Sequence, residues 1–433
     1  MDAKKNLSVI LNLAWRNIWK NKRRTILTML IIIFGCYMIV LFNAFSVGSH
    51  DQMIDDAVGL HTGHIQIHEK GYWEKKSLSY VFKTDKKYLN DIKLLQKKKR
   101  ISGFTPRINA GALLSHNDST SLAIINGIDP AKEKTVSVMH TKIIQGRFLS
   151  SEDSTHAIVG KTLAKNLSIK IGSKIALISQ GFGGRVAAEY LTVVGIFKSG
   201  NPKYDMTTVF MPFKQATETF SMENYISSLV VKVANISYVE SVKNDLITLS
   251  KQRQARCSAN NKTDIKCATH EVMAWDKLMP QLVQWIQMDD ASLYIIDLIL
   301  YLVVAFGVLN TIQMSVFERT REFGVMLAIG TTPRQVLYMV LVESVFISSI
   351  GIAIGITLGS LTSWYFNVNP IDVSQYADEM AAYGVTSVLM PAKLTYANVI
   401  ATLCLSFISS ILFTIFPAKR AASLNPIKAI RQL

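Results

Sequence analysis

The sequence predicts a membrane protein with four transmembrane α-helices and a large α+β extracytoplasmic domain inserted between helices 1 and 2. Two observations support this fold class. Apolar segments of spanning length, about 20 residues, lie near both ends of the 433-residue chain. Between the first and the second lies a long stretch of mixed polarity with short runs typical of strands. A chain of this length is also expected to form more than one folding unit.

Four segments define the predicted spans. Residues 25–50, 298–317 and 394–418 contain no Asp, Glu, Lys or Arg, and residues 335–371 contain only Glu343. Each segment is too long and too apolar for an ordinary surface helix. We therefore predict transmembrane helices at residues 25–47, 291–317, 336–364 and 396–417.

Basic residues predict the orientation, because cytoplasmic loops are enriched in Lys and Arg. The segment 1–24 holds Lys4, Lys5, Arg16, Lys20, Lys22, Arg23 and Arg24, and the second–third connection holds Arg319, Arg321 and Arg334. The third–fourth connection has only Lys393 against three acids. We therefore expect a cytoplasmic loop at 318–335, a cytoplasmic tail at 418–433, and extracytoplasmic segments at 48–290 and 365–395.

The positive charge does not require a nucleic-acid partner. The net charge is +16 at pH 7, and much of the excess lies in the predicted cytoplasmic segments. The mildly basic outer domain could contact anionic lipid or an acidic partner, or it could present a solvated surface. Before the first span, residues 6–20 place Leu, Ile and Trp on one helical face. This pattern predicts an interfacial helix on the inner leaflet within the cytoplasmic segment 1–24, or an extension of the first span.

The outer domain shows alternating strand and turn signals. Two short helices are expected near 163–166 and 214–219, and residues 235–249 and 275–286 suit helical arms that rise from the first two spans. The predicted strands are GHIQIHE (63–69), SLAIINGID (121–129), HAIVG (156–160), SKIALIS (173–179), YLTVVGIF (190–197), TTVFMPF (207–213) and SLVVKV (228–233).

Polar and small residues inside the spans are candidates for special roles. Charges within a bilayer are costly, so Asp297 and Glu343 indicate either a proton relay or a buried interhelical hydrogen bond. Their predicted depths place them near opposite faces, which makes a direct pair unexpected. Gly351, Gly355 and Gly359 repeat every four residues and predict a close helix–helix contact.

A pair of cysteines and a group of histidines in the outer domain each allow two interpretations. Cys257 and Cys267 lie in a polar stretch of the outer domain and predict either a disulfide or two free thiols. His61, His64 and His68 suggest a metal site or ordinary strand histidines, and no carboxylate or cysteine completes a ligand set beyond the adjacent Glu69. We expect no metal in this chain.

No motif predicts that the chain itself is an enzyme. The segment AIVGKT (157–162) ends like a phosphate-binding loop, but Thr155 occupies the position of the required first glycine. No serine–histidine–acid or cysteine–histidine arrangement stands out. We expect ATP and Mg²⁺ to be bound by a partner and not by this chain.

Three separated segments resemble the FtsX-like permease family of ABC transporters. The start, LAWRNIWKNKRRTILT, is similar to that of the family. The second–third connection matches its E-R-T-R-E-x-G signature at Glu318, Arg319, Thr320, Arg321, Glu322, Gly324, Ala328, Gly330 and Arg334. The C-terminal segment matches a second signature at Pro417, Ala418, Arg420, Ala421, Pro426 and Ala429. In the outer domain, NGIDP, GRFL and LTVVGIF also look like the core domain of the family.

The resemblance implies a role for the cytoplasmic loop. In the family this loop forms a coupling helix that docks on a separate ATPase, so the implied coupling residues are Glu318, Arg319, Arg321, Glu322, Gly324 and Arg334. The implied partners are a cytoplasmic ABC ATPase and a second permease subunit, in a homodimer or heterodimer. The implied location is the bacterial inner membrane, with both termini in the cytoplasm.

Within the family, the four-span layout and the start of the outer domain look most like the lipoprotein-releasing (Lol) permeases. Only 24 residues precede the first span, so we expect no fused ATPase of the MacB type. The resemblance implies extraction of lipoproteins or related hydrophobic substrates, with delivery to a periplasmic carrier. The loop that would contact such a carrier, residues 180–188, has no proline and differs in character. Two alternatives remain open: mechanotransmission to a periplasmic adaptor and efflux duct, and regulation of a periplasmic hydrolase.

Overall fold

The chain forms two compact units. The structure is a computed structural model that describes residues 15–16, 19–83, 86–97, 100–259, 269–376 and 389–431. The helical unit comprises residues 1–52, 285–372 and 389–433, and the inserted domain comprises residues 53–284 with 373–388. Each unit has its own hydrophobic core, and we describe them separately.

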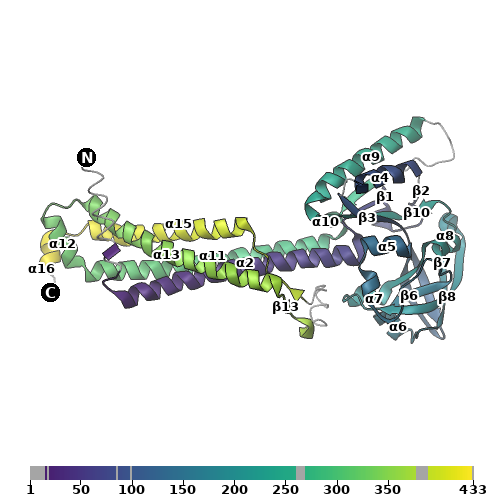
Figure 1. The fold of residues 1–433 in the computed structure, drawn as a ribbon, viewed down its shortest axis with the longest axis horizontal. Coiled ribbons are helices and arrows are strands. Elements are labelled where there is room, and N and C mark those ends of the chain that lie inside the picture. Colours follow the sequence, from purple (N-terminus) through teal and green to yellow (C-terminus); the bar gives the residue numbers. More distant parts are fainter. Residues whose placement is uncertain are drawn as a thin grey trace. The chain divides into compact units, whose positions relative to one another are not determined.

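Four long apolar helices make up most of the helical unit (Figure 1). They are α2 (Lys22–Ala57), α11 (Pro280–Glu318), α13 (Pro333–Val368) and α15 (Tyr396–Ala422). With the α+β domain between the first and the second, they confirm the predicted fold class. A helix of 36 residues, the length of α2 and α13, extends about 54 Å at 1.5 Å per residue. It therefore exceeds the hydrocarbon core of a bilayer, about 30 Å.

Local sequence signals fix the start of α13. Thr332 caps α13: its side chain accepts from the backbone N–H of Gln335, whose side chain accepts from the Thr332 N–H in return. Pro333 follows at the first helical position, where its missing N–H costs nothing. The helices share a core that includes Ile32, Val308 and Ile347, and Ser344 and Thr414 hydrogen-bond between α13 and α15 at 2.7 Å.

Two short helices follow the long ones. They are α12 (Thr320–Ala328), between α11 and α13, and α16 (Pro426–Arg431), after α15. A small ladder pairs β13 (Ile371–Asp372) with β14 (Leu389–Met390).

The inserted domain is built on a ten-stranded sheet within the described residues. Six strands pair in a closed ring, in the order β3, β4, β9, β6, β8 and β7. The remaining sheet strands extend from β3 through β11 to β1 and β12, and β5 pairs with β8. The strands are β1 (Ile65–Glu69), β3 (Ile101–His116), β4 (Ser119–Ile128), β5 (Ile143–Gly146), β6 (His156–Gly160), β7 (Lys174–Gln180), β8 (Val186–Phe197), β9 (Thr208–Pro212), β11 (Ser228–Val233) and β12 (His270–Ala274), with β2 (Phe82–Lys83) and β10 (Tyr225–Ile226) as a separate pair.

Three hydrophobic clusters of described residues hold this domain together, and the smallest includes Phe197 and Phe210. The largest includes Ile108, Leu177, Leu191 and Val209 from the ring strands. The second joins β1 and β11 to two helices through residues such as Ile92 and Leu246. The helices of the domain are α3 (Tyr72–Lys75), α4 (Lys86–Lys97), α5 (Pro130–Val136), α6 (Lys161–Asn166), α7 (Pro202–Thr207), α8 (Phe213–Thr219), α9 (Val239–Ala259) and α10 (Trp275–Leu278).

All seven predicted strand segments contain strands, and α6 and α8 cover the two predicted short helices. The longest strand, β3, was not predicted. The arm expected at residues 235–249 is wrong, because α9 packs on α4 and β12 within the inserted domain instead of extending a span. Residues 275–286 divide at Met279 into α10 and the start of α11.

Some predictions fall outside the described residues. The interfacial helix lies mostly within residues 1–14 and 17–18. Cys267 is also outside, and the side chain of Cys257, in α9, is not described. The interfacial helix and the disulfide therefore stay predictions.

Candidate functional site

The predicted coupling loop forms a helix at the end of the bundle where α11 stops. Arg319 interrupts the helical path with φ −105° and ψ 14°, and α12 begins at Thr320. On α12, Phe323 is 1% and Val325 is 44% exposed, and Ile329, the residue directly after the helix, is 77% exposed. The loop is therefore amphipathic, with one face packed on the bundle and one face free.

The packed face of α12 meets α16. A Cβ added to Gly324 would lie 2.7 Å from Ala429 Cβ, a distance that ordinary Cβ atoms do not reach. Figure 1 shows the two helices side by side at the end of the bundle. Gly324 thus allows the C-terminal helix to support α12, and the two family signatures meet in space.

Arg319 is at the centre of a group of charged residues. Its Nε donates to Glu322 Oε2 at 2.9 Å, and its Nη1 donates to Glu343 Oε2 at 3.1 Å. Ser315 Oγ adds a longer bond to Glu343 Oε1 at 3.4 Å. The guanidinium lies 5.0 Å from the ring centroid of Phe323. Arg319 is 8% and Glu343 4% exposed, so a buried ion pair joins the start of α12 to α13.

The start of α2 and the two residues before it supply further hydrogen-bond donors to these carboxylates. Arg24 Nη1 donates to Glu318 Oε2 at 2.6 Å and Asn21 Nδ2 donates to the same oxygen at 2.7 Å. Lys20 Nζ pairs with Glu322. Partial burial alone would raise the pKa of the Glu322 carboxyl, but the hydrogen bonds from Lys20 and Arg319 outweigh it and hold the pKa below its ordinary value.

The predicted coupling residues therefore divide into two groups. Glu318, Arg319 and Glu322 lie close together and bind side chains of their own chain. Arg321 and Arg334 are exposed. Asn21 was not predicted to belong to this cluster, and Lys20 and Arg24 were predicted only to set the orientation in the membrane. The exposed residues, which we call the free face, are Arg321, Val325 and Ala328 on α12, Ile329 directly after it and Arg334 at the start of α13.

The two intramembrane carboxylates have separate partners. Asp297 on α11 accepts two bonds from Asn43 Nδ2 on α2, at 2.9 and 3.2 Å, whereas Glu343 bonds to Arg319. Between α2 and α11, nearer the C-terminal end of α2 and the N-terminal end of α11, His50 Nε2 lies 2.9 Å from Asp289 Oδ2. Both carboxylates thus take part in interhelical hydrogen bonds.

The glycine strip of α13 lies against α2. A Cβ on Gly355 would lie 2.7 Å from the Ile33 carbonyl oxygen and 2.9 Å from Cys36 Cβ. Gly351 approaches Ile32 and Gly359 approaches Val40 in the same way. The predicted close contact is therefore present, and its partner is the first long helix.

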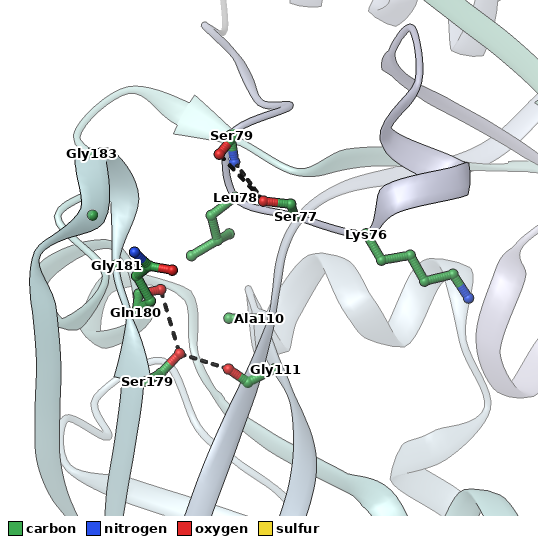
Figure 2. A pocket seen from close by; sticks show the side chains of 11 residues that line it. Lys76, Ser77, Leu78, Ser79, Ala110, Gly111, Ser179, Gln180, Gly181 and Gly183 are labelled. Atoms are coloured by element: carbon green, nitrogen blue, oxygen red, sulfur yellow. Dashed lines mark hydrogen bonds between the residues drawn. The ribbon is translucent and has the colours of Figure 1, made fainter.

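In the inserted domain, the loop after β7 folds back onto the domain. The Phe182 N–H donates to the Phe220 carbonyl at 2.8 Å, and its ring stacks on Tyr225 with centroids 4.9 Å apart. Beside this loop lies a pocket of about 400 Å³. Figure 2 shows Ser179 bonded to the Gly111 carbonyl of the neighbouring strand, with the Lys76 amine directed away. The pocket is lined by Lys76, Ser77, Leu78, Ser79, Ala110, Gly111, Ser179, Gln180, Gly181, Gly183 and Gly184.

The strand histidines are packed into the domain. His68 is fully buried and its Nε2 lies 2.8 Å from Gln66 Oε1. Burial lowers the pKa of His68 to about 4, and burial with the nearby Lys232 lowers that of His64 to about 4. Among the described residues, no group of three His, Cys, Asp or Glu side chains is placed to hold a metal ion.

Comparison with known families matches both units. Residues 25–249 match the MacB-like periplasmic core domain and residues 294–426 match the FtsX-like permease C-terminal family. The chain belongs to the FtsX/MacB-type family of ABC transporter permeases. It is accordingly a multi-pass membrane protein with a periplasmic domain between its first two long helices.

Individual relatives have sequence identities of 22% and 26% to this chain. The macrolide export ATP-binding/permease protein MacB of Neisseria gonorrhoeae is 26% identical over 418 residues, which are 95% of this chain and 59% of that protein. The lipoprotein-releasing system transmembrane protein LolC of Neisseria meningitidis is 22% identical over 368 residues, which are 82% of this chain and 84% of that protein. The periplasmic region of MacB from Actinobacillus actinomycetemcomitans aligns with 53% of the chain and 97% of its own length, at 16% identity and a TM-score of 0.35. The chain thus spans about three fifths of the length of the MacB relatives.

Proposed function

We propose that this chain is the permease subunit of an inner-membrane ABC exporter, with both termini and α12 in the cytoplasm. A separate ATPase binds the free face of α12, and a second permease subunit completes the transporter. One observation carries the proposal: Val325 on α12 and Ile329 directly after it are exposed, whereas the opposite face of α12 is packed against α16. Exposed apolar side chains beside Arg321 and Arg334 suit a docking surface better than a solvated turn.

In this proposal the charged residues of the loop have two roles. Arg321 and Arg334 contact the ATPase directly. Glu318, Arg319, Glu322 and Gly324 fix the position of α12 through their contacts within the chain. A helix held by a buried ion pair, by more exposed ion pairs and by α16 is preorganised, so binding loses less conformational freedom.

The proposed substrates are lipoproteins or related amphipathic molecules extracted from the inner membrane. The support is the family and the likeness to a protein named for lipoprotein release. A second candidate is mechanotransmission, in which the periplasmic domain drives an adaptor. Contacts of Phe182 with Phe220 and Tyr225 favour this alternative, because they hold the loop that would reach a lipoprotein carrier against its own domain.

The test is purification of the tagged chain from its native host, with mass spectrometry of the bound proteins. A stoichiometric ATPase is expected with the wild-type chain. Co-purifying lipoproteins or a carrier would support extraction, and an adaptor with an outer-membrane duct would support the alternative. Ile329→Glu is expected to reduce the bound ATPase at least tenfold, because it places a charge in a desolvated contact.

The matched control is Ile171→Glu, which makes the same change at an exposed position of the inserted domain. It should leave ATPase recovery unchanged. Equal recovery of the ATPase with wild type, Ile329→Glu and Ile171→Glu would show that the free face is not the docking surface.

A further inference from the structure

A continuous series of charge contacts connects three parts of the helical unit. It begins at Glu343 on α13, passes through Arg319 to Glu322 on α12, and ends at Lys20 before α2. A parallel contact joins Glu318, the last residue of α11, to Arg24 on α2. We call these six residues the charge link.

Arg319 gives the link its mechanical character. It lies at the break between α11 and α12, and its side chain bonds to carboxylates on α12 and α13 at the same time. Because Arg319 and Glu343 are both buried, separating them would leave the Glu343 carboxylate without a compensating charge in a dry environment. Movement of α12 relative to α13 is therefore strongly opposed.

The choice of cations in the N-terminal segment also needs explanation. Lys22 and Arg23 lie in the same short segment as Lys20 and Arg24 and are exposed. Within the described part of the chain, Lys22 and Arg23 form no ion pair. If these basic residues only set the orientation of the chain in the membrane, all four would serve equally well. Instead, Lys20 and Arg24 bind the two carboxylates that flank the α11–α12 break.

We propose that the charge link transmits movement of α12 to α2 and α13, so that Lys20 and Arg24 are part of the coupling element. This inference rests on the proposed function, in which an ATPase moves α12. Lys20, Arg24, Glu318, Arg319, Glu322 and Glu343 are positioning residues that act through α12 and do not contact the ATPase. The link stays closed through the ATP cycle.

The first test uses the native residues. A carbodiimide joins Lys20 Nζ to the Glu322 carboxyl carbon as an amide, and the reagent leaves as its urea with the carboxyl oxygen. The two side chains already touch and both are accessible. The crosslinked peptide pair is quantified by mass spectrometry in the complete complex, without nucleotide and with ATP and Mg²⁺. Equal yields within twofold are expected. A fivefold or greater loss with ATP would show that the link opens and would overturn the proposal.

The second test breaks and restores one pair. Arg24→Glu is expected to change ATP turnover per assembled complex at least fivefold, with ATPase recovery unchanged. The double variant Arg24→Glu with Glu318→Arg should return turnover to within twofold of wild type. Arg23→Glu is the matched control, since it makes the same charge change at the neighbouring position, and it should behave as wild type. A contact that only stabilises the fold would lower the amount of complex and not the turnover per complex.

The outcomes separate the two proposals. If no ATPase binds the wild-type chain, the proposed function fails and this inference fails with it. If the ATPase binds every variant and Arg24→Glu turns over ATP like Arg23→Glu, the charge link is wrong while the proposed function stands. Failure of the double variant to recover would also contradict the pairing, because both charges would then act independently.

Discussion

Arg319 Nη1 lies 3.1 Å from Glu343 Oε2, at a place where both side chains are almost fully buried. Removing one member of a buried pair leaves the other charge uncompensated, which typically costs about 3–5 kcal/mol. Arg319→Met should therefore destabilise the helical unit by about this amount, because Glu343 keeps only the long Ser315 bond. The measurement is the thermal midpoint of the purified chain in detergent.

The double variant Arg319→Met with Glu343→Leu is the control for this prediction. Replacing a buried pair by apolar side chains is often neutral or stabilising, so most of the lost stability should return. An unchanged midpoint in Arg319→Met alone would mean that water or lipid headgroups solvate Glu343 and that the pair is not buried in the membrane protein.

Much of the fold could be predicted because it depends on local patterns. The spans are long uncharged runs, and seven strands show apolar runs with turn residues between them. Strand β3 was not predicted because Gly103, Pro106 and Gly111 interrupt its pattern of strand-forming residues. Position 103 lies close to Thr135, so that an added Cβ would be 2.3 Å from its Oγ1. This close approach, which requires glycine, depends on tertiary structure and has no local signal.

The candidate site could be predicted only in part for the same reason. The charges at 318–322 stand out in the sequence, but their partners are distant. Lys20 and Glu322 are 302 positions apart, and Arg24 and Glu318 are 294 apart. Helical spacing relates residues three or four positions apart, so it could not distinguish paired cations from those that only set the orientation. That distinction appears when the helices are packed.

The close contact between α13 and α2 predicts sensitivity at Gly355. In Gly355→Ala the new Cβ would lie 2.7 Å from the Ile33 carbonyl oxygen, and this backbone atom cannot move aside as a flexible side chain can. Overpacking of this kind typically costs about 1–3 kcal/mol. The thermal midpoint in detergent should fall accordingly.

Ala353→Leu is the control, because Ala353 is exposed on the same helix. It adds more volume than Gly355→Ala and should still leave the midpoint nearly unchanged. If both variants behave alike, the two helices do not approach as closely as the glycine strip indicates.

Buried histidines predict that the inserted domain loses stability in mild acid. The pKa of His68 falls from 6.5 to about 4 because of burial, so between these values the unfolded chain binds more protons than the folded chain. The stabilising contribution is complete above pH 6.5 and is lost as the pH falls to 4. At about 1.4 kcal/mol per pKa unit, the loss for this side chain is of the order of 3 kcal/mol.

The check is the unfolding midpoint of the full chain at several pH values between 7.5 and 4.5. His68→Gln removes the titrating group and should flatten part of the pH dependence. The matched control is His116→Gln, the same substitution at a half-buried histidine at the end of β3. An identical slope in wild type and His68→Gln would mean that water reaches His68 in the folded domain.

The orientation of the chain gives the last prediction. Basic residues concentrate before α2, between α11 and α13, and after α15, which favours a cytoplasmic position for these segments. Ser119, at the start of β4, and Ser423, after α15, are both exposed and lie on opposite sides of the membrane in this orientation. Each is replaced by Cys in a chain whose four native cysteines are removed, and spheroplasts are treated with a membrane-impermeant maleimide. The cysteine at 119 should be labelled at once, and the one at 423 only after the membrane is permeabilised. The reverse pattern would place α12 and its free face outside the cell, where no ATPase could reach them, and would contradict both the orientation and the proposed function.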